Sequence, residues 1–496
     1  MRAGEPRSTV GRLSSAALLA AQGRSREPKA CPNSTLPHPA AAPLPLSRKR
    51  ARGACALALL SLCLLLPSLA SADDWPQWRG PTRDGVWRET GIIERFPGPQ
   101  IKLRWSVPIG GGYCGPTVAQ GRVYVSDHVA EPVEAERVHC FQWDTGRRLW
   151  TYSYPCDYAT VSYKAGPRAS VAIYGGRAYS LGTVGHLHWF DAATGAVLWK
   201  KNLVAEHQAR VPVWGIASAP LVEGDLVIVM AGCRPHGSVT AFDARTGALR
   251  WSSLDDTIAY SSPMMIDQAG RRIVVCWTAQ RIVGLDVRTG KLYWEYPYVY
   301  RRWCDGILTP TLYKDRLFVS SFTEGSLMLK LDADRPTVAP VWRRFGRDER
   351  QTDSMHSLMC NPYIADEFIY GFDSYGQFRC LEAGMGNRVW ENTKITTQAR
   401  WGSAHMVVNA GRVWIFNDRG ELIIGRVSPR GFDEVSRATL LPPTLGQLNR
   451  GKGVTWSHPA FAYRHVFNRN DEELVCASLA ADETPSRGDW WKRSKN

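Results

Sequence analysis

A repeated turn motif constrains this chain more than any other feature of its sequence. The motif reads Asp-x-x-Thr-Gly-x-x-x-Trp and is clearest at 243–251. Looser copies follow the same spacing, so that tryptophans recur at intervals between 43 and 52 residues, with a mean period near 47.5. The repeating tryptophans are Trp105, Trp150, Trp199, Trp251, Trp294, Trp342 and Trp390. A fixed period of this length indicates a repeat architecture.

Each repeat contains short runs rich in β-branched and aromatic residues, separated by Gly or Asp, which is typical of strands. Four short strands in 40 to 50 residues form one blade of a β-propeller. Eight second strands can be counted, although the unit at 423–440 lacks its Trp and leaves seven blades as the competing count. The eight begin near Arg122, Arg177, Asp225, Arg272, Arg316, Glu367, Arg412 and His465.

The two ends of the repeat region complement each other. The last unit has a third strand at 474–479 and then turns polar without a Trp strand, whereas 102–107 reads as a Trp strand that precedes the first full unit. We expect 102–107 to complete the eighth blade, which leaves no open sheet edge. The sequence therefore predicts an all-β fold, an eight-bladed propeller of four-stranded antiparallel blades closed by an N-terminal strand.

The motif itself has a structural explanation. Asp and Thr can accept and donate hydrogen bonds within the turn, Gly supplies positive φ, and the indole fills the space between neighbouring blades. The seven repeating tryptophans are accordingly interpreted as docking residues. Asp191, Asp243 and Asp286 are interpreted as turn residues and not as catalytic acids.

The first 72 residues predict export. Basic residues at 48–52 precede an apolar run at 54–69 and the small-residue site Ala70-Ser71-Ala72, which is the pattern of a signal peptide cleaved near Ala72. A spanning helix is disfavoured because the run has only 16 residues and contains Pro67. The expected organisation is a disordered extension or misassigned start at 1–47, a signal peptide at 48–72, a leader at 73–100, one propeller at 101–480 and a polar tail at 481–496. The expected location is the periplasm or cell envelope.

Neither the net charge nor the cysteine content indicates a special class of protein. The chain of 496 residues has a formal net charge of +15, but residues 1–72 hold ten Lys/Arg and two Glu, so the remainder carries only 15 − 8 = +7. This modest charge does not indicate a nucleic-acid partner. The nine cysteines after residue 72 lie singly, which does not resemble a disulfide framework.

The repeat resembles the tryptophan-docking repeat of pyrroloquinoline quinone (PQQ) propellers, which include quinoprotein dehydrogenases and the non-enzymatic scaffold BamB. The segments 74–81 (Asp-Trp-Pro-Gln-Trp-Arg-Gly-Pro) and 453–460 (Gly-Val-Thr-Trp-Ser-His-Pro-Ala) are similar to the opening and closing segments of exported members. The resemblance implies a fold, not an activity. No two cysteines are adjacent, whereas quinoprotein dehydrogenases place a Cys-Cys ring over the cofactor, and little chain remains for insertions around a calcium site.

Residues just before the innermost strands are expected at one mouth of the central channel, where binding residues collect on rigid scaffolds. Aromatic, Arg and His side chains there suit a flat anionic ligand such as a quinone carboxylate, a sugar acid or a peptide terminus. They could instead plug the channel and hydrogen-bond one another. The candidate ligand-binding residues are Arg168, Trp214, Asp305, His356, Arg400, Trp401, His405, Trp456 and His458, with Tyr113 and Tyr260 beside them.

Two functions follow from these features. The first is a non-catalytic exported propeller, expected to be monomeric, that binds a protein, peptide or glycan in the cell envelope. The second is a PQQ-dependent dehydrogenase or PQQ sensor, for which PQQ with calcium is the cofactor. No catalytic residue and no metal ligand is assigned, because the strand pair His186 and His188 lacks an evident third ligand.

Overall fold

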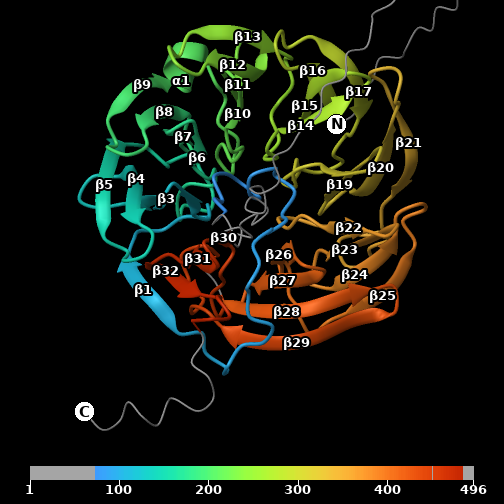
Figure 1. Ribbon diagram of the computed structural model, residues 1–496. Coiled ribbons are helices and arrows are strands. Elements are labelled where there is room, and N and C mark those ends of the chain that lie inside the picture. The colour runs from blue at the N-terminus through green and yellow to red at the C-terminus, as the bar shows by residue number, and fades with distance from the viewer. Residues whose placement is uncertain (1–72, 449–450, 484–496) are drawn as a thin grey trace, which may run out of the picture. The chain divides into compact units, whose positions relative to one another are not determined.

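The computed structural model describes residues 73–448 and 451–483, which lie within one compact unit. These residues form eight four-stranded antiparallel sheets arranged as a ring around a central axis (Figure 1). The predicted eight-bladed propeller is confirmed, and the competing count of seven blades is wrong. The unit without a Trp also forms a complete four-stranded sheet, and its third strand contains four consecutive buried residues.

Each blade runs from a short inner strand to a longer outer strand. The first four blades are, in chain order, β2 (Thr117–Ala119), β3 (Arg122–Val129), β4 (Ala135–Gln142) and β5 (Arg148–Pro155); β6 (Ala172–Tyr174), β7 (Arg177–Leu181), β8 (His186–Asp191) and β9 (Val197–Asn202); β10 (Leu221–Glu223), β11 (Leu226–Cys233), β12 (Gly237–Asp243) and β13 (Leu249–Ser253); and β14 (Met264–Gln268), β15 (Arg271–Trp277), β16 (Arg281–Asp286) and β17 (Leu292–Pro297).

The other four blades complete the ring. They are β18 (Thr311–Tyr313), β19 (Arg316–Ser321), β20 (Gly325–Leu331) and β21 (Val338–Arg344); β22 (Tyr363–Ala365), β23 (Phe368–Phe372), β24 (Phe378–Glu382) and β25 (Arg388–Asn392); β26 (Ala404–Asn409), β27 (Arg412–Asn417), β28 (Glu421–Ser428) and β29 (Gly431–Thr439); and β30 (Ala460–Ala462), β31 (His465–Arg469), β32 (Glu473–Ser478) and β1 (Leu103–Pro108). One short helix, α1 (Leu203–His207), follows β9 on the face opposite the motif turns.

The last blade joins the two ends of the chain. Strand β1 pairs with β32 in antiparallel register, with Trp105 opposite Cys476 and Val107 opposite Leu474. The expected closure by an N-terminal strand is therefore confirmed. Because the outer strand of this blade comes from the other end of the sequence, the ring is held at its seam by backbone hydrogen bonds.

The repeating tryptophans contact the next blade. For six of them, the indole Nε1 donates to a backbone carbonyl in the turn between the third and fourth strands of that blade. In all of these turns except the one that contacts Trp390, the glycine lies against the ring. The bonds run from Trp105 to Trp143 (2.8 Å), Trp150 to Ala192 (3.1 Å), Trp199 to Ala244 (3.3 Å), Trp251 to Val287 (3.0 Å), Trp342 to Ala383 (2.8 Å) and Trp390 to Ser428 (2.8 Å).

Trp294 differs from the other six. Its Nε1 donates to the Gln268 side chain of its own blade at 2.9 Å. The Gln268 amide in turn donates to the carbonyl of Thr337 in the next blade at 2.7 Å. The turn of that blade reads Asp332-Ala-Asp-Arg-Pro336 and lacks the Thr-Gly pair, so a glutamine bridges the gap that the missing turn leaves.

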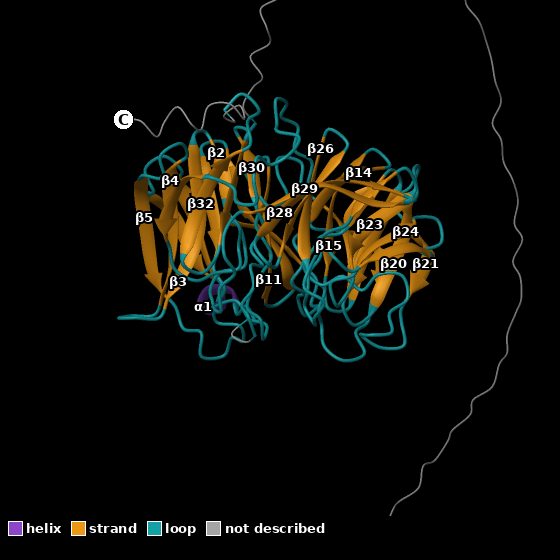
Figure 2. Ribbon diagram, turned by 90° about the horizontal axis from the view of Figure 1, so that it is seen from below, coloured by secondary structure: helices purple, strands orange, loops and turns teal. Residues whose placement is uncertain are grey.

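The leader does not lie outside the ring. Figure 1 shows it crossing the centre of the ring, passing out between the blades of β26 and β30, and continuing into β1. Bridges from Trp75 to Val118 and from Val86 to Val408 fix it to inner strands of two blades. Figure 2 shows the loops that project from the two faces of the ring.

Other sequence predictions have mixed outcomes. The signal peptide, the extension before it and most of the tail lie outside the described residues. Within 73–448 and 451–483, no helix is long and apolar enough to span a membrane.

The nine cysteines in this part of the chain are all unpaired, and seven of them are buried. His186 and His188 share one face of β8 with ring centroids 6.3 Å apart.

Candidate functional site

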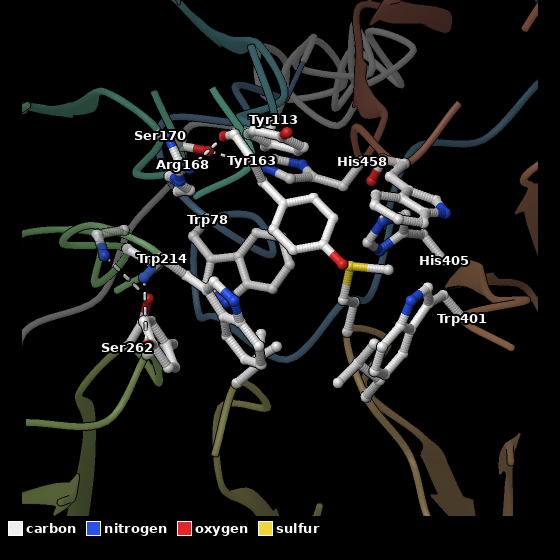
Figure 3. A pocket seen from close by; sticks show the side chains of 17 residues that line it. Trp78, Tyr113, Tyr163, Arg168, Ser170, Trp214, Ser262, Trp401, His405 and His458 are labelled. Carbon is white, nitrogen blue, oxygen red and sulfur yellow. Dashed lines mark hydrogen bonds between the residues drawn. The ribbon is translucent and has the colours of Figure 1, made fainter. Parts of the chain in front are cut away.

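A pocket with a cavity volume of about 170 Å³ opens on the axis where the inner strands begin (Figure 3). It is more than ten times the size needed to hold one water. Seven of its 17 lining residues are aromatic and come from the loops between blades and from the leader. They are Trp78, Tyr113, Tyr163, Trp214, Tyr260, Trp401 and Trp456.

Prolines place several of these residues. Pro116, Pro220, Pro263, Pro310, Pro362 and Pro459 each stand immediately before an inner strand. At the first position of a strand a proline costs no ladder hydrogen bond. Three of the aromatic wall residues, Tyr113, Tyr260 and Trp456, lie three positions before one of these prolines.

The structure brings six of the nine candidate residues to the pocket wall. These six are Arg168, Trp214, Trp401, His405, Trp456 and His458. Tyr113 and Tyr260 also lie there. The other three candidates, Asp305, His356 and Arg400, do not line the pocket and bond to neighbouring loops.

Those three residues are engaged in local interactions. Asp305 accepts from the backbone N–H and hydroxyl of Thr323 at 2.8 and 3.0 Å. His356 Nδ1 donates to the carbonyl of Phe322 at 2.9 Å. The Arg400 guanidinium lies 4.3 Å from the ring centre of Trp401 and pairs with the Glu349 carboxylate at 2.7 Å. Each therefore supports the wall from behind.

Arg168 lines the pocket, but its donors are already used. Its two terminal nitrogens donate to the backbone carbonyls of Gly166, Ser162 and Tyr163. The guanidinium also lies 4.8 Å from the ring centre of Tyr113. Arg168 thus fixes the loop that carries Tyr163, and its bidentate face is not free for an anion.

The two histidines of the wall are uncharged at neutral pH. His405 Nε2 donates to the Trp456 carbonyl at 2.8 Å, and burial lowers its pKa to about 4. His458 Nε2 accepts from the backbone N–H of Gly115 at 3.1 Å, and burial, followed by the neighbouring His405, lowers its pKa to about 3. Both rings act as neutral polar walls.

Trp78 is a wall residue that the sequence prediction missed. It comes from the leader, lines the pocket, and donates from Nε1 to the Thr309 hydroxyl at 2.8 Å. Its ring meets that of His458 edge-on at 4.4 Å. It also lines a smaller, adjoining cavity with Arg79 and Gly85. A signal existed in the sequence, because Trp78 is a tryptophan outside any repeat.

Arg83 anchors the leader in the channel. It is 7% exposed and donates to the carbonyls of Pro220 and Pro263 at 2.6 and 2.8 Å. These two prolines precede the inner strands of neighbouring blades. Burial lowers the pKa of the guanidinium to about 9, which still leaves it charged at neutral pH. Arg83 thereby fixes the position of the Trp78 segment.

Two aromatic residues of the wall have unusual backbones. Tyr163 has φ of 58° and Trp401 has φ of 76°, both in the left-handed region that bulky side chains rarely adopt. Such conformations cost on the order of 1 kcal/mol or more and persist where the surroundings hold them. Figure 3 shows both side chains directed at the same open space.

Comparisons with known proteins connect the fold to two groups. Residues 134–392, just over half of the chain, match the family described as outer membrane protein assembly factor BamB. Among curated proteins, the chain is 30% identical over 196 residues to a quinohemoprotein alcohol dehydrogenase of Comamonas testosteroni, covering 37% of this chain and 26% of that protein. It is 29% identical over 164 residues to quinohemoprotein alcohol dehydrogenase ADH-IIG of Pseudomonas putida, covering 31% and 21%. The chain thus spans about a quarter of the length of these relatives.

Solved structures show the same two groups. BamB from Moraxella catarrhalis aligns with a TM-score of 0.51 at 18% identity, covering 76% of this chain and 97% of that chain. The quinohemoprotein alcohol dehydrogenase of Comamonas testosteroni aligns with a TM-score of 0.55 at 14% identity, covering 82% and 80%. At these identities the likeness concerns the fold alone.

Proposed function

Because the chain belongs to the family of the outer membrane protein assembly factor BamB, we propose that it is a non-catalytic binding protein of the cell envelope. The axial pocket is the proposed binding site. The predicted signal peptide at 48–72 and the outer-membrane role in the family's description both support an envelope location.

The observation that carries this proposal is the composition of the pocket wall. Seven aromatic residues surround the space, while the two wall histidines are neutral and hydrogen-bonded to backbone groups. Aromatic walls with a few fixed polar groups favour recognition of a ligand. General acid–base catalysis instead favours a group whose pKa lies near the working pH, and the pKa values of His405 and His458 lie well below it.

A PQQ-dependent dehydrogenase is the second candidate, and the names of the curated relatives favour it. The flat aromatic walls fit the fused rings of PQQ. The donor set fits its three carboxylates poorly, because the terminal nitrogens of Arg168 already bond to three backbone carbonyls. In the described part of the chain, no three His, Cys, Asp or Glu side chains are grouped to hold a metal ion such as calcium.

Calorimetric titration with PQQ and calcium, together with a dye-linked assay of alcohol oxidation, separates the two candidates. We expect no PQQ-dependent turnover. Turnover that is lost on changing Trp401 to Ala, but not on changing the outer Trp390 to Ala, would place dehydrogenase chemistry in the pocket. That result would contradict the proposal.

A further inference from the structure

The interior of the pocket is nearly free of unbalanced charge. Behind Arg168 lies Glu136, which is fully buried and accepts from the backbone N–H of Thr183 at 2.9 Å and from the Tyr154 hydroxyl at 2.5 Å. The Thr183 hydroxyl lies 3.5 Å from an Arg168 nitrogen. Thr183 thus links the two groups, with its backbone N–H on the Glu136 carboxylate and its hydroxyl beside the guanidinium. The wall histidines are neutral. Arg168 is the one charged residue among those that line the pocket, and its terminal nitrogens are engaged by backbone carbonyls.

Two buried indole donors have nothing to bond to. The Nε1 groups of Trp401 and Trp456 have no hydrogen-bond partner within the described chain, and the two side chains are only 7% and 8% exposed. Leaving such a donor buried and unpaired costs about 1–3 kcal/mol. Both side chains line the pocket. A ligand that places an oxygen acceptor beside these indoles would relieve this cost.

The wall around these donors is held in place. The Trp401 ring is packed between the Arg400 guanidinium, 4.3 Å from its centre, and Phe322, with ring centroids 4.5 Å apart. Its strained backbone, with φ of 76°, turns it toward the open space (Figure 3). Trp78 lines the same space from the leader, which crosses the centre of the ring (Figure 1). The pocket therefore suits the end of a ligand.

From these observations we infer that the pocket binds a terminal neutral sugar residue of a glycan, an inference that rests on the proposed binding function. A sugar ring presents C–H groups on its faces, which pack on aromatic rings, and oxygens at its edge, which accept from indole N–H groups. It carries no charge. A peptide end or a PQQ molecule brings charge that the pocket does not balance.

An exposed tryptophan extends the site outward. Trp303, in the loop before β18, is 38% exposed, and the Arg400 guanidinium that covers Trp401 lies 6.0 Å from its ring centre. Trp303 thus offers a second flat surface near the mouth. A second sugar ring of the same glycan would stack there, so longer oligosaccharides bind more tightly than disaccharides.

Isothermal titration calorimetry of the purified protein tests the inference. The probes are cellohexaose, maltohexaose, xylohexaose, mannohexaose and chitohexaose, with trigalacturonic acid, PQQ with calcium, and a proline-rich decapeptide as comparators. We expect at least one neutral hexasaccharide to bind with a Kd below about 1 mM. Its affinity should change less than twofold between 50 and 500 mM NaCl, because no ion pair forms. It should also change less than twofold between pH 5.5 and 8.5, where both wall histidines stay neutral.

Variants connect the binding to the pocket. Trp401→Phe keeps a ring and the same backbone strain but removes the N–H, and should weaken binding about fivefold. Trp456→Phe should have a similar effect and provides a second test if the first variant folds poorly. Trp390→Phe, which removes an N–H bonded to Ser428 on the outer rim, is the matched control and should leave the affinity unchanged. Trp303→Ala should weaken binding of the hexasaccharide and leave the affinity for a disaccharide unchanged.

Three results would overturn the inference. They are no binding by any of the five neutral sugars at 10 mM, binding that Trp401→Phe and Trp456→Phe both leave unchanged, or binding of the charged comparators alone. If the decapeptide binds and the sugars do not, the glycan inference is wrong, but the proposed binding function is retained. PQQ-dependent turnover would contradict both the glycan inference and the non-catalytic binding function.

Discussion

Asp305 shows how burial changes the chemistry of a single side chain. It is fully buried, and burial raises its pKa to about 7 despite the hydrogen bonds from Thr323. The folded protein therefore holds a proton that the unfolded chain, with an Asp pKa near 4, has released. The contribution of Asp305 to the free energy of unfolding is thus largest below about pH 4 and falls as the pH rises from about 4 to 7.

Asp305→Asn tests this sign. The neutral amide can still bond to Thr323, so the variant should gain stability relative to the unaltered protein as the pH rises from 4 to 7, and the difference should level off above pH 7. Urea denaturation at a series of pH values measures the difference. The exposed Asp433→Asn is the control for replacing a carboxylate by an amide. A flat difference for Asp305→Asn would show that the carboxyl is ionised in the folded state.

At the scale of the element, the turn glycines determine how blades meet. A β-carbon on Gly290 would lie 2.5 Å from Cε3 of Trp251, which packs on this turn from the preceding blade, whereas nothing lies within 4 Å of one on Gly270. Both glycines belong to the blade of β14–β17, and their φ angles are 70° and 68°. The pair therefore separates the backbone requirement for glycine from the space that the indole occupies.

We expect Gly270→Ala to lower the free energy of unfolding by about 1 kcal/mol, the cost of a left-handed backbone. Gly290→Ala should cost about 1–3 kcal/mol more, because the tryptophan must also move. Guanidinium denaturation of both variants gives the comparison. Equal losses would mean that Trp251 tolerates the added carbon and that the docking contact is loose.

The sequence predicts the blades but not every contact between them. The repeat predicted every blade because strand alternation and the motif turn are local signals with a fixed spacing. It did not predict the bridge through Gln268, because that contact replaces a turn whose Thr-Gly pair is lost. A residue on another strand that compensates for the lost turn does not change the spacing of the repeat.

The sequence predicted only the part of the pocket that the repeat forms. Residues before the inner strands follow from the repeat, and six of the nine candidates reach the wall. Trp78 was missed because the leader has no period, and its path through the channel depends on Arg83 reaching Pro220 and Pro263, about 140 and 180 residues further along the chain. Asp305, His356 and Arg400 have suitable chemistry, but tertiary hydrogen bonds turn them away from the space.

For the whole molecule, the seam between the first and last blades decides whether the ring unfolds as one unit. Trp105 sits in β1, which pairs with β32, and its indole donates to the Trp143 carbonyl of the first blade at 2.8 Å while its ring faces Gly146. The side chain thus joins the last blade to the first, while the backbone of β1 pairs with β32. Losing the indole frees the first blade from its neighbour and weakens the packing of β1 at the seam.

Trp105→Ala should therefore lower the free energy of unfolding by about 3–5 kcal/mol. It should also raise amide hydrogen exchange in β32 and β5 more than in β15 and β16 on the far side of the ring, because opening starts at the seam. Trp105→Phe keeps the ring contact with Gly146, loses only the N–H bond, and should cost about 1 kcal/mol. Exchange that rises equally in all blades would show that the ring opens only as a whole, and exchange confined to β1 would show that closure contributes little to its stability.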